Sequence, residues 1–505
     1  MKSKLFGILL MIEAAALLLT SLVGWYYHIH GGEQDWDSFM ITAAITGAVG
    51  LSLWLISRWS KKALKIEDTF LIVSLSWILF SCFGMLPFLL TGAVDNVTDA
   101  FFETMSGFTT TGSTILRDVD GQSHAILFWR SVMQWLGGLG IVVFTLAFIP
   151  SVAKGSKNMS LFAAEAPGLS VEKLAPTMQK TSSILWTIYI FLTVLCTFFY
   201  WLGPMDFFDA VCHAMTTIST GGFSTHADSI GFYHSVYLEY TCAIFMLLSG
   251  ISFGIYYFTM RGRFDVIRTN EELHVYLISI AVTTLFFWGL FYLGPSFDGV
   301  TAEQLAGYPE RGEPAIRTAF FHVSSMLSNT GFAAENNNYD LWGMLFIIPT
   351  MVMMIIGGCA GSTSGGIKMV RVIVIFKMIR NALKELIHPT GMFSVKVSGH
   401  TIDDISVRRV INYLSLFVFL FVVNIVVLSL TGLSVEDACI SFISYFSNLG
   451  SGSGATGPDA CLADLPTASK WVLAFDMLIG RLEIITVLLL FSHSLTNCGM
   501  MSAGS

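Results

Sequence analysis

The chain has 505 residues, of which 54% are hydrophobic and only 12% are charged. A soluble domain carries about twice that charged fraction, so the composition excludes a soluble globular protein. The net charge of −8 is uninformative by itself, whereas the positions of the charges along the chain are informative.

Several apolar stretches reach the roughly 20 residues that a helix needs to cross a lipid bilayer. The first, 5–27, follows two lysines and resembles a signal peptide. Its length and the apolar stretch that soon follows favour a retained helix. We predict spanning helices near residues 5–27, 39–57, 68–91, 125–149, 181–203, 234–260, 275–294, 341–380 (long and interrupted), 410–432 and 471–493.

Basic residues gather in the loops on one side of these predicted helices. Most of the 27 Lys and Arg residues belong to this side. Its loops comprise residues 2–4, 58–65, 154–180, 261–268 and 368–409. By the positive-inside rule this side is cytoplasmic, and both termini are predicted to lie there.

Four semi-polar stretches on the opposite side resemble one another. They read DAFFETMSGFTTTGST (99–114), DAVCHAMTTISTGGFST (209–225), TAFFHVSSMLSNTGFAA (318–334) and DACISFISYFSNLGSGS (437–453). When the copies are aligned on their first residues, four glycines coincide without gaps: Gly112, Gly222, Gly331 and Gly450. The chain therefore contains a fourfold internal repeat.

The repeat divides the chain into five predicted parts. A two-helix domain at 1–66 precedes four pore repeats at 67–155, 156–268, 269–390 and 391–505. The third repeat includes the interrupted apolar stretch.

Each copy predicts a short helix followed by a loop that returns to the same side. Its first residue, Asp99, Asp209, Thr318 or Asp437, is a plausible N-cap, and about three helical turns follow. So short a helix cannot span the membrane, and non-helical backbone at that depth must face protein or water. Four such loops around one axis would offer a cation rings of carbonyls and half-helix C-termini. The alternative is four similar outer loops that only pack against the helices.

The motifs TTTGST, STGGFST, SNTGFAA and NLGSGSG, each between two spanning helices, resemble those of the Trk/Ktr/HKT superfamily of K⁺ transporters, and most closely its TrkH group. The resemblance implies an all-α membrane protein with ten spanning helices and four pore half-helices. These form four helix–pore loop–helix repeats around a central pore. It also implies K⁺ uptake across the bacterial inner membrane, a homodimer, and a TrkA-like cytoplasmic nucleotide-binding ring as regulatory partner. No organic cofactor is expected in this chain.

On this resemblance, K⁺ passes a filter formed by the residues that precede and include the four glycines. Glycine at all four positions goes with K⁺ preference in the family. The expected filter residues are Thr110, Thr111, Gly112, Thr220, Gly221, Gly222, Asn329, Thr330, Gly331, Asn448, Leu449 and Gly450. One departure is Ser451 after the fourth glycine, where proline is expected in many relatives.

A run of small residues, GGCAGSTSGG at 357–366, interrupts the eighth apolar stretch. Each glycine costs a helix about 1 kcal/mol relative to alanine, which favours an irregular stretch over close helix packing. In the resembled family an intramembrane loop under the filter acts here as a gate. The gate residues expected on this basis are Gly357, Gly358, Gly361, Ser362, Gly365, Gly366, Lys368 and Arg481.

Two arginines fall inside predicted spans. Arg481 is near the centre of the last one, where insertion costs at least about 2.5 kcal/mol. It either pairs locally with Asp476 or Glu483, or places below the filter a positive charge that hinders cations. The family's arginine on the same helix favours the second interpretation. Arg130 is nearer the outer end of its span and is expected to snorkel or to brace the filter.

Other functions find little support. The eight cysteines show no CxxC motif, which argues against a disulfide framework or a metal site. His213 and His322 occupy equivalent half-helix positions and are expected to bond within the scaffold. No catalytic cluster indicates an enzyme, and the shared orientation of the copies disfavours the inverted repeats of secondary transporters. A K⁺ symporter coupled to H⁺ or Na⁺, or a Na⁺-permeable relative, remains the alternative.

Overall fold

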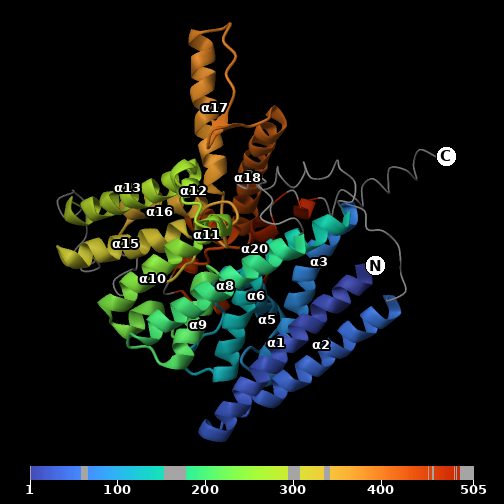
Figure 1. Ribbon diagram of the computed structural model, residues 1–505. Coiled ribbons are helices and arrows are strands. Elements are labelled where there is room, and N and C mark those ends of the chain that lie inside the picture. Colours follow the sequence, from blue (N-terminus) through green and yellow to red (C-terminus); the bar gives the residue numbers. More distant parts are fainter. Residues whose placement is uncertain are drawn as a thin grey trace.

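The computed structural model describes residues 2–57, 66–152, 178–293, 308–334, 342–452, 454–457, 460–482, 484 and 486–488. These residues are predominantly helical, and the long helices lie side by side in one bundle (Figure 1). Six of the described helices are long and apolar enough to cross a membrane, or seven if one bent pair counts as a span. The chain is thus a helical membrane protein, and the total of ten spans stays a prediction.

The first two helices form a hairpin. They are α1 (Lys2–Gly31) and α2 (Trp36–Ser57), and they pack closely along their length (Figure 1). Glycines permit this approach, since a Cβ atom at Gly7 would lie 2.6 Å from the carbonyl oxygen of Gly50.

The rest of the described residues repeat one pattern four times: a long helix, a short half-helix and a further helix, which is interrupted in the second and third repeats. The first repeat has α3 (Ile66–Gly84) with its extension α4 (Leu86–Thr91), α5 (Val97–Phe108) and α6 (His124–Val152). The second has α8 (Met178–Trp201), α9 (Phe207–Ile218), the turn η1 (Ser229–Tyr233), α10 (Val236–Ser249) and α11 (Phe253–Met260). The third has α13 (Glu271–Leu293), α15 (Glu313–Leu327), α16 (Met344–Ile355) and α17 (Met369–Ile387). The fourth has α18 (Asp404–Leu430), α19 (Val435–Phe446) and α20 (Thr467–Leu482).

Short elements connect the repeats: α12 (Asp265–Thr269) and the strands β1 (Lys396–Val397) and β2 (His400–Thr401). The turns η3 (Gly454–Thr456) and η4 (Leu462–Asp464) lie within the fourth repeat, between α19 and α20. The two strands pair antiparallel, with Lys396 opposite Thr401.

The half-helices α5, α9, α15 and α19 begin earlier than predicted. Asn96, Asp206 and Ser434 are the N-caps of α5, α9 and α19, and each side chain accepts a hydrogen bond from the backbone N–H three residues later. The N–H groups that donate belong to the residues expected as caps, Asp99, Asp209 and Asp437, which lie in the first helical turn. The expected cap of the third repeat, Thr318, lies inside α15. This helix starts at Glu313 and has a proline in its first turn. The prediction was wrong because an acidic residue is favourable at either position of a helix N-terminus.

The span predicted at 234–260 is not one straight helix. α10 and α11 are bent by 91° at their junction. At the break, some backbone groups have no partner within the helix and bond to a distant segment of the chain. Gly250 O accepts from Cys359 N at 2.9 Å, and Phe253 N donates to Gly361 O at 3.1 Å. A buried helix break is tolerated because these groups find partners.

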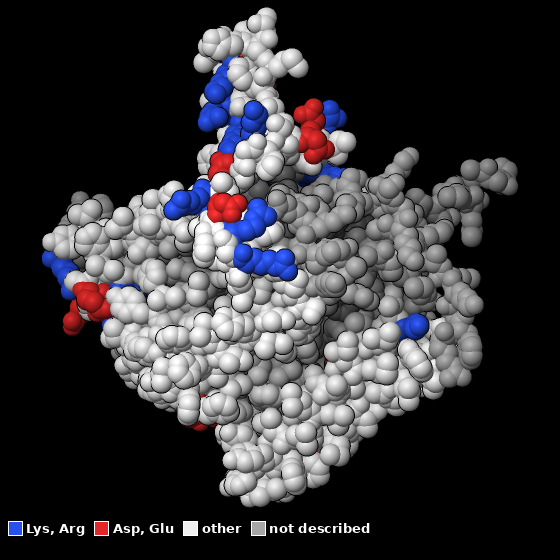
Figure 2. Space-filling model, in the orientation of Figure 1, with Lys and Arg blue, Asp and Glu red and all other residues white. Residues whose placement is uncertain are grey.

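The end of α17 extends beyond the other helices (Figure 1). The second half of this helix carries Lys377, Arg380 and Lys384. Figure 2 shows Lys and Arg gathered around this protruding end, while the middle of the same face carries few charges. Such a division between an apolar belt and a charged end is typical of membrane proteins.

Candidate functional site

The loop after each half-helix adopts the same unusual backbone. The second residue after the half-helix has a left-handed φ, and so has the glycine two positions later. The first set comprises Thr110 (55°), Thr220 (54°), Asn329 (55°) and Asn448 (54°). The second comprises Gly112 (88°), Gly222 (79°), Gly331 (85°) and Gly450 (78°). Strain of this kind repeated four times marks a functional rather than an incidental geometry.

The four loops meet in a closed ring, which we call the glycine ring. A Cβ atom on each of its glycines would overlap a carbonyl oxygen of the next repeat. The pairs are Gly112 with Gly221, Gly222 with Thr330, Gly331 with Leu449, and Gly450 with Thr111. The fourth repeat thereby closes on the first. Glycine is needed at each position both for its φ and for this close approach.

Side chains of the loops bond to the surrounding scaffold. The Thr111 hydroxyl lies 2.8 Å from that of Thr109, and the Thr330 hydroxyl lies 2.7 Å from that of Ser328. The amide of Asn448 donates to Met477 O at 2.9 Å. These three side chains bond to the scaffold, whereas the ring glycines contact backbone carbonyls of the neighbouring loops.

One position in every half-helix braces its surroundings. It is occupied by Glu103, His213, His322 and Ser441 in the four repeats. His213 bonds to Ser224 at 2.9 Å, His322 to Thr350 at 2.9 Å and Ser441 to Thr456 at 2.9 Å. The expectation that both histidines bond within the scaffold is confirmed. Among the described residues, no cluster of His, Cys, Asp and Glu is arranged to hold a metal ion.

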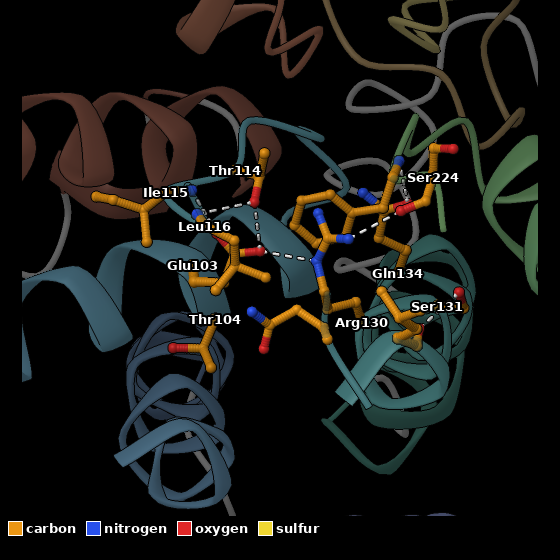
Figure 3. Close-up of polar contacts among 12 residues, drawn as sticks. Glu103, Thr104, Thr114, Ile115, Leu116, Arg130, Ser131, Gln134 and Ser224 are labelled. Carbon is orange, nitrogen blue, oxygen red and sulfur yellow. Dashed lines mark hydrogen bonds and ion pairs between the residues drawn. The ribbon is translucent and has the colours of Figure 1, made fainter. Parts of the chain in front are cut away.

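Glu103 forms a buried ion pair with Arg130 behind the ring (Figure 3). Arg130 Nε donates to Glu103 Oε1 at 2.9 Å, and the two side chains are 2% and 0% exposed. Glu103 also accepts from Ile115 N at 2.7 Å, in the loop of its own repeat. Arg130 Nη1 donates to Ser224 O at 2.8 Å, in the loop of the second repeat. Arg130 therefore joins two loops of the ring, and it braces them rather than snorkels.

The run of small residues is an irregular loop between α16 and α17, as predicted. This small-residue loop (356–368) is closed by hydrogen bonds between Gly357 N and Ile367 O and between Ile367 N and Ile355 O, both 2.9 Å. A Cβ atom at Gly357 would overlap Gly365 O, so the two arms touch. Gly361 and Gly366 have left-handed φ angles of 78° and 64°.

The small-residue loop packs under the C-terminal ends of three half-helices. Thr363 Oγ1 donates to Ile218 O at 3.0 Å, at the end of α9. Ser364 Oγ donates to Asn329 Oδ1 at 3.1 Å, after α15. A Cβ atom at Gly365 would overlap Ser447 O, after α19. The loop thus lies directly beneath the glycine ring.

Arg481 contacts this loop and not Asp476. Its Nη1 donates to Thr363 O at 2.8 Å, and its Nη2 donates to Gly137 O at 3.0 Å and Gly138 O at 3.3 Å. The side chain is 5% exposed, and its hydrogen bonds go to backbone carbonyls of the loop and of α6. The other suggested partner, residue 483, lies outside the described residues. Lys368 Nζ donates to the carbonyl of Ser364 within the loop.

Glu272 is a functional candidate that sequence reasoning missed. It is buried at the start of α13, and its Oε1 accepts from Ala360 N at 2.8 Å and Val370 N at 3.1 Å. It therefore holds both the small-residue loop and the first turn of α17. An acidic pair at a helix start is ordinary in sequence, and no local pattern points from it to a loop 88 residues away.

On the side of the ring opposite the small-residue loop, His226 joins the first two repeats. Its Nδ1 lies 2.7 Å from Asp120 Oδ1 and its Nε2 lies 3.2 Å from Asp209 Oδ2. Partial burial lowers the pKa of His226, but its bonds to the two carboxylates outweigh this and raise it above the ordinary value. Burial likewise raises the pKa of Asp209, but bonds from His226 and from Tyr233 outweigh it and leave that pKa well below the ordinary range.

These shifts predict a pH-dependent contribution of His226 to stability. A raised histidine pKa stabilises the fold below the unfolded value of about 6.5, and the effect is lost as pH rises through the folded pKa. Because the pKa of Asp209 is lowered, its carboxylate stabilises the fold above about pH 4. This stabilisation is lost as pH falls through the pKa that Asp209 has in the folded protein. We expect the difference in unfolding free energy between the native chain and His226→Gln to be greatest between about pH 4 and 6.5. It should be about 1 kcal/mol or less, because the cluster is partly solvated.

Thermal unfolding of both proteins in detergent across this range measures the effect. His400→Gln, in the exposed strand β2, is the control and should show no comparable trend. A difference that grows above pH 7 would contradict the assignment.

Comparison with known proteins places this geometry in a family. The family model TrkH, described as a cation transport protein, matches residues 36–498. The Trk system potassium uptake protein TrkH of Escherichia coli K12 is 34% identical over 497 residues, which is 97% of this chain and 98% of that protein. The Trk system potassium uptake protein TrkI of Halomonas elongata is 34% identical over 465 residues, 91% of this chain and 90% of that protein. The crystal structure of the potassium transporter TrkH from Vibrio parahaemolyticus matches with a TM-score of 0.83 and 30% identity, over 97% of each chain.

Proposed function

Because the chain belongs to the TrkH family of cation transport proteins, we propose that it takes up K⁺ across the bacterial inner membrane through the glycine ring. The relatives named as Trk potassium uptake proteins match it over nearly their whole length, which supports K⁺ as the cargo.

The closed ring is the observation that carries the proposal. Four repeats bring their glycines against one another's carbonyls, in an order that returns from the fourth repeat to the first. Carbonyl oxygens arranged in this way can replace the water shell of a cation. The half-helices end directly before these loops, so their partly negative C-termini favour the same charge.

The filter in this proposal comprises the three residues of each loop that end at the ring glycine. Their carbonyls, from Thr110 to Gly112 and at the matching positions of the other repeats, coordinate K⁺ without its water. No side-chain carboxylate takes part, so discrimination rests on the spacing and number of carbonyls.

The small-residue loop is the gate in this proposal. It lies beneath the ring, and Glu272 and Arg481 hold it there through backbone hydrogen bonds. The Arg481 charge, buried at this level, raises the energy of a cation below the ring. Opening moves the loop and Arg481 away from the path together.

The basic end formed around α17 is cytoplasmic in this proposal, as are both termini. There it would meet a nucleotide-binding ring like TrkA, with the transporter as a homodimer. We propose the same division into a two-helix domain at 1–66 and four pore repeats at 67–155, 156–268, 269–390 and 391–505.

Rubidium uptake into proteoliposomes tests the function. We expect ⁸⁶Rb⁺ entry to be suppressed by K⁺ and far less by Na⁺ at equal concentration. Imposed H⁺ and Na⁺ gradients in the same assay separate channel-like uptake from coupled symport, since only a coupled carrier accumulates Rb⁺ against its own gradient. Failure of K⁺ to compete would refute the proposal.

Replacing Arg481 with glutamine tests the gate. Two like unit charges about 7 Å apart repel by about 2 kcal/mol at an effective dielectric constant of about 20. We therefore expect Arg481→Gln to raise Rb⁺ uptake about tenfold or more. Arg481→Lys keeps the charge and should stay near the native rate. Equal increases in both variants would assign the effect to the lost hydrogen bonds and not to the charge, and unchanged uptake in the first would remove Arg481 from the gate.

A further inference from the structure

The second repeat differs from the others directly before its ring glycine. Gly221 stands where the other repeats have Thr111, Thr330 and Leu449. The carbonyl of Gly221 is the one that packs against Gly112, so its placement affects two neighbouring loops of the ring. A residue without a side chain has nothing of its own with which to fix this carbonyl.

A glutamine from the first repeat occupies the space that Gly221 leaves open. Gln134 lies on α6, one helical turn after Arg130, and is fully buried (Figure 3). A Cβ atom at Gly221 would overlap the side-chain amide of Gln134. The glycine and the glutamine are therefore complementary: a side chain at 221 and the amide of Gln134 cannot both be present.

The amide of Gln134 bonds to the backbone on both sides of Gly222. Its Nε2 donates to Gly221 O at 2.6 Å, and its Oε1 accepts from Phe223 N at 3.0 Å. A backbone carbonyl only accepts and a backbone N–H only donates, so the two bonds define one orientation of the amide. Together they hold the peptide groups that flank the ring glycine.

In the first and third repeats a threonine hydroxyl of the loop bonds to another side chain of its own repeat, whereas Leu449 of the fourth repeat has no polar side chain for such a bond. Thr111 bonds to Thr109, and Thr330 bonds to Ser328, the first residue after the half-helix in each case. The matching residue of the second repeat is Ser219, whose hydroxyl donates to Thr216 O at 3.2 Å, just as the hydroxyls of Thr109 and Ser328 donate to carbonyls of their own half-helices. Because residue 221 is glycine, the second repeat has no threonine hydroxyl to bond to Ser219. Gln134 of the first repeat supplies hydrogen bonds to this loop.

We infer that Gln134 is a positioning residue that sets the selectivity of the glycine ring. It does so by fixing the Gly221 carbonyl and the Gly222 peptide, without itself contacting the ion. The inference rests on the proposed function, since it assigns a role within the filter. Without the amide, the second loop loses its brace and the ring can contract around the smaller Na⁺.

Competition measurements on reconstituted variants test the inference. Gln134→Leu keeps the size of the side chain and removes both hydrogen bonds. We expect the ratio of K⁺ to Na⁺ competition against ⁸⁶Rb⁺ uptake to fall about tenfold, as a lost buried hydrogen bond implies. Thr241→Val, a buried change on α10 whose hydroxyl bonds only within its own helix, is the control and should keep the native ratio.

A double variant supplies an independent test by rescue. Gly221→Thr alone should disrupt the ring, because its side chain overlaps Gln134. Gln134→Ala alone removes the brace. Combined, the two changes recreate the arrangement of the third repeat, with the introduced threonine bonded to Ser219. We expect the double variant to recover selectivity to within about threefold of the native ratio, since the brace is replaced and the overlap removed.

Each outcome decides the question. If Gln134→Leu keeps the native ratio of K⁺ to Na⁺ competition, the inference is overturned. It is also overturned if the variant loses ⁸⁶Rb⁺ uptake rate while this ratio stays unchanged. Should Gln134→Leu fail to fold, the double variant decides: recovery supports the inference and a folded protein without selectivity refutes it. If the native protein itself shows no K⁺ competition, the proposed function fails instead, and the two failures are thereby distinguished.

Discussion

A Gly222→Ala variant is expected to lose about a hundredfold or more of its Rb⁺ uptake. Gly222 has a φ of 79°, and a Cβ atom there would overlap the carbonyl oxygen of Thr330. Alanine in this backbone region is strained by about 1 kcal/mol, and the overlap must in addition displace a carbonyl of the ring. A combined cost near 3 kcal/mol on the conducting geometry corresponds to about a hundredfold in rate.

The chain offers a matched control for this substitution. Gly262, between α11 and α12, has a φ of 76°, and no neighbouring atom lies within 4 Å of the position that a Cβ atom would take there. Gly262→Ala therefore carries the same backbone strain without an overlap and should retain most of the native uptake. Equal losses in the two variants would mean that backbone strain alone, and not the ring, limits transport.

Replacing Arg130 with methionine is expected to give the largest loss of stability. The change leaves the Glu103 carboxylate, which is 0% exposed, without its cation. It also removes the bond to Ser224 O and the contact of the guanidinium with the Phe223 ring, 4.1 Å from its centroid. Breaking a buried pair on one side typically costs about 3–5 kcal/mol. We expect a clear fall in the thermal midpoint in detergent, together with loss of uptake.

An exposed ion pair provides the comparison. Arg117 bonds to Asp464 at 2.6 Å, but both side chains are about two-thirds exposed. Surface pairs contribute at most about 1 kcal/mol, so Arg117→Met should hardly move the midpoint. The double variant Arg130→Met with Glu103→Gln should recover part of the loss, because it removes the stranded charge. A midpoint for Arg130→Met as high as that for Arg117→Met would contradict a bracing role.

The half-helices show how far local sequence patterns reach. Their existence and the alignment of Gly112, Gly222, Gly331 and Gly450 follow from repeat spacing and from the length that a membrane helix needs. Their first residues were misplaced by several positions, since Asn96 caps α5 ahead of the predicted Asp99. Capping depends on which of two neighbouring polar side chains reaches the free N–H groups, and composition alone does not decide this.

The break between α10 and α11 falls at SGISFG (249–254), where two glycines and two serines weaken a helix. The apolar residues on both sides nevertheless led to the prediction of one helix over 234–260. In the fold, the small-residue loop pairs with Gly250 and Phe253 at this break. The same loop was predictable as irregular, since its glycines disfavour a helix wherever it lies.

Apolar run length, charge distribution and the fourfold motif are local or periodic properties, and they suffice for a helical membrane protein with four glycine loops. The order of these loops around the ring, and the residues that hold them, depend on contacts between distant segments. Gln134 reaches Gly221 across 87 residues, and Arg481 reaches Thr363 across 118. Neither side chain belongs to a motif with its partner, because such contacts arise only when the packed helices bring the repeats together. The glycine positions were thus readable from the chain, whereas the contacts of Gln134 with the glycine ring and of Arg481 with the small-residue loop were decided by packing.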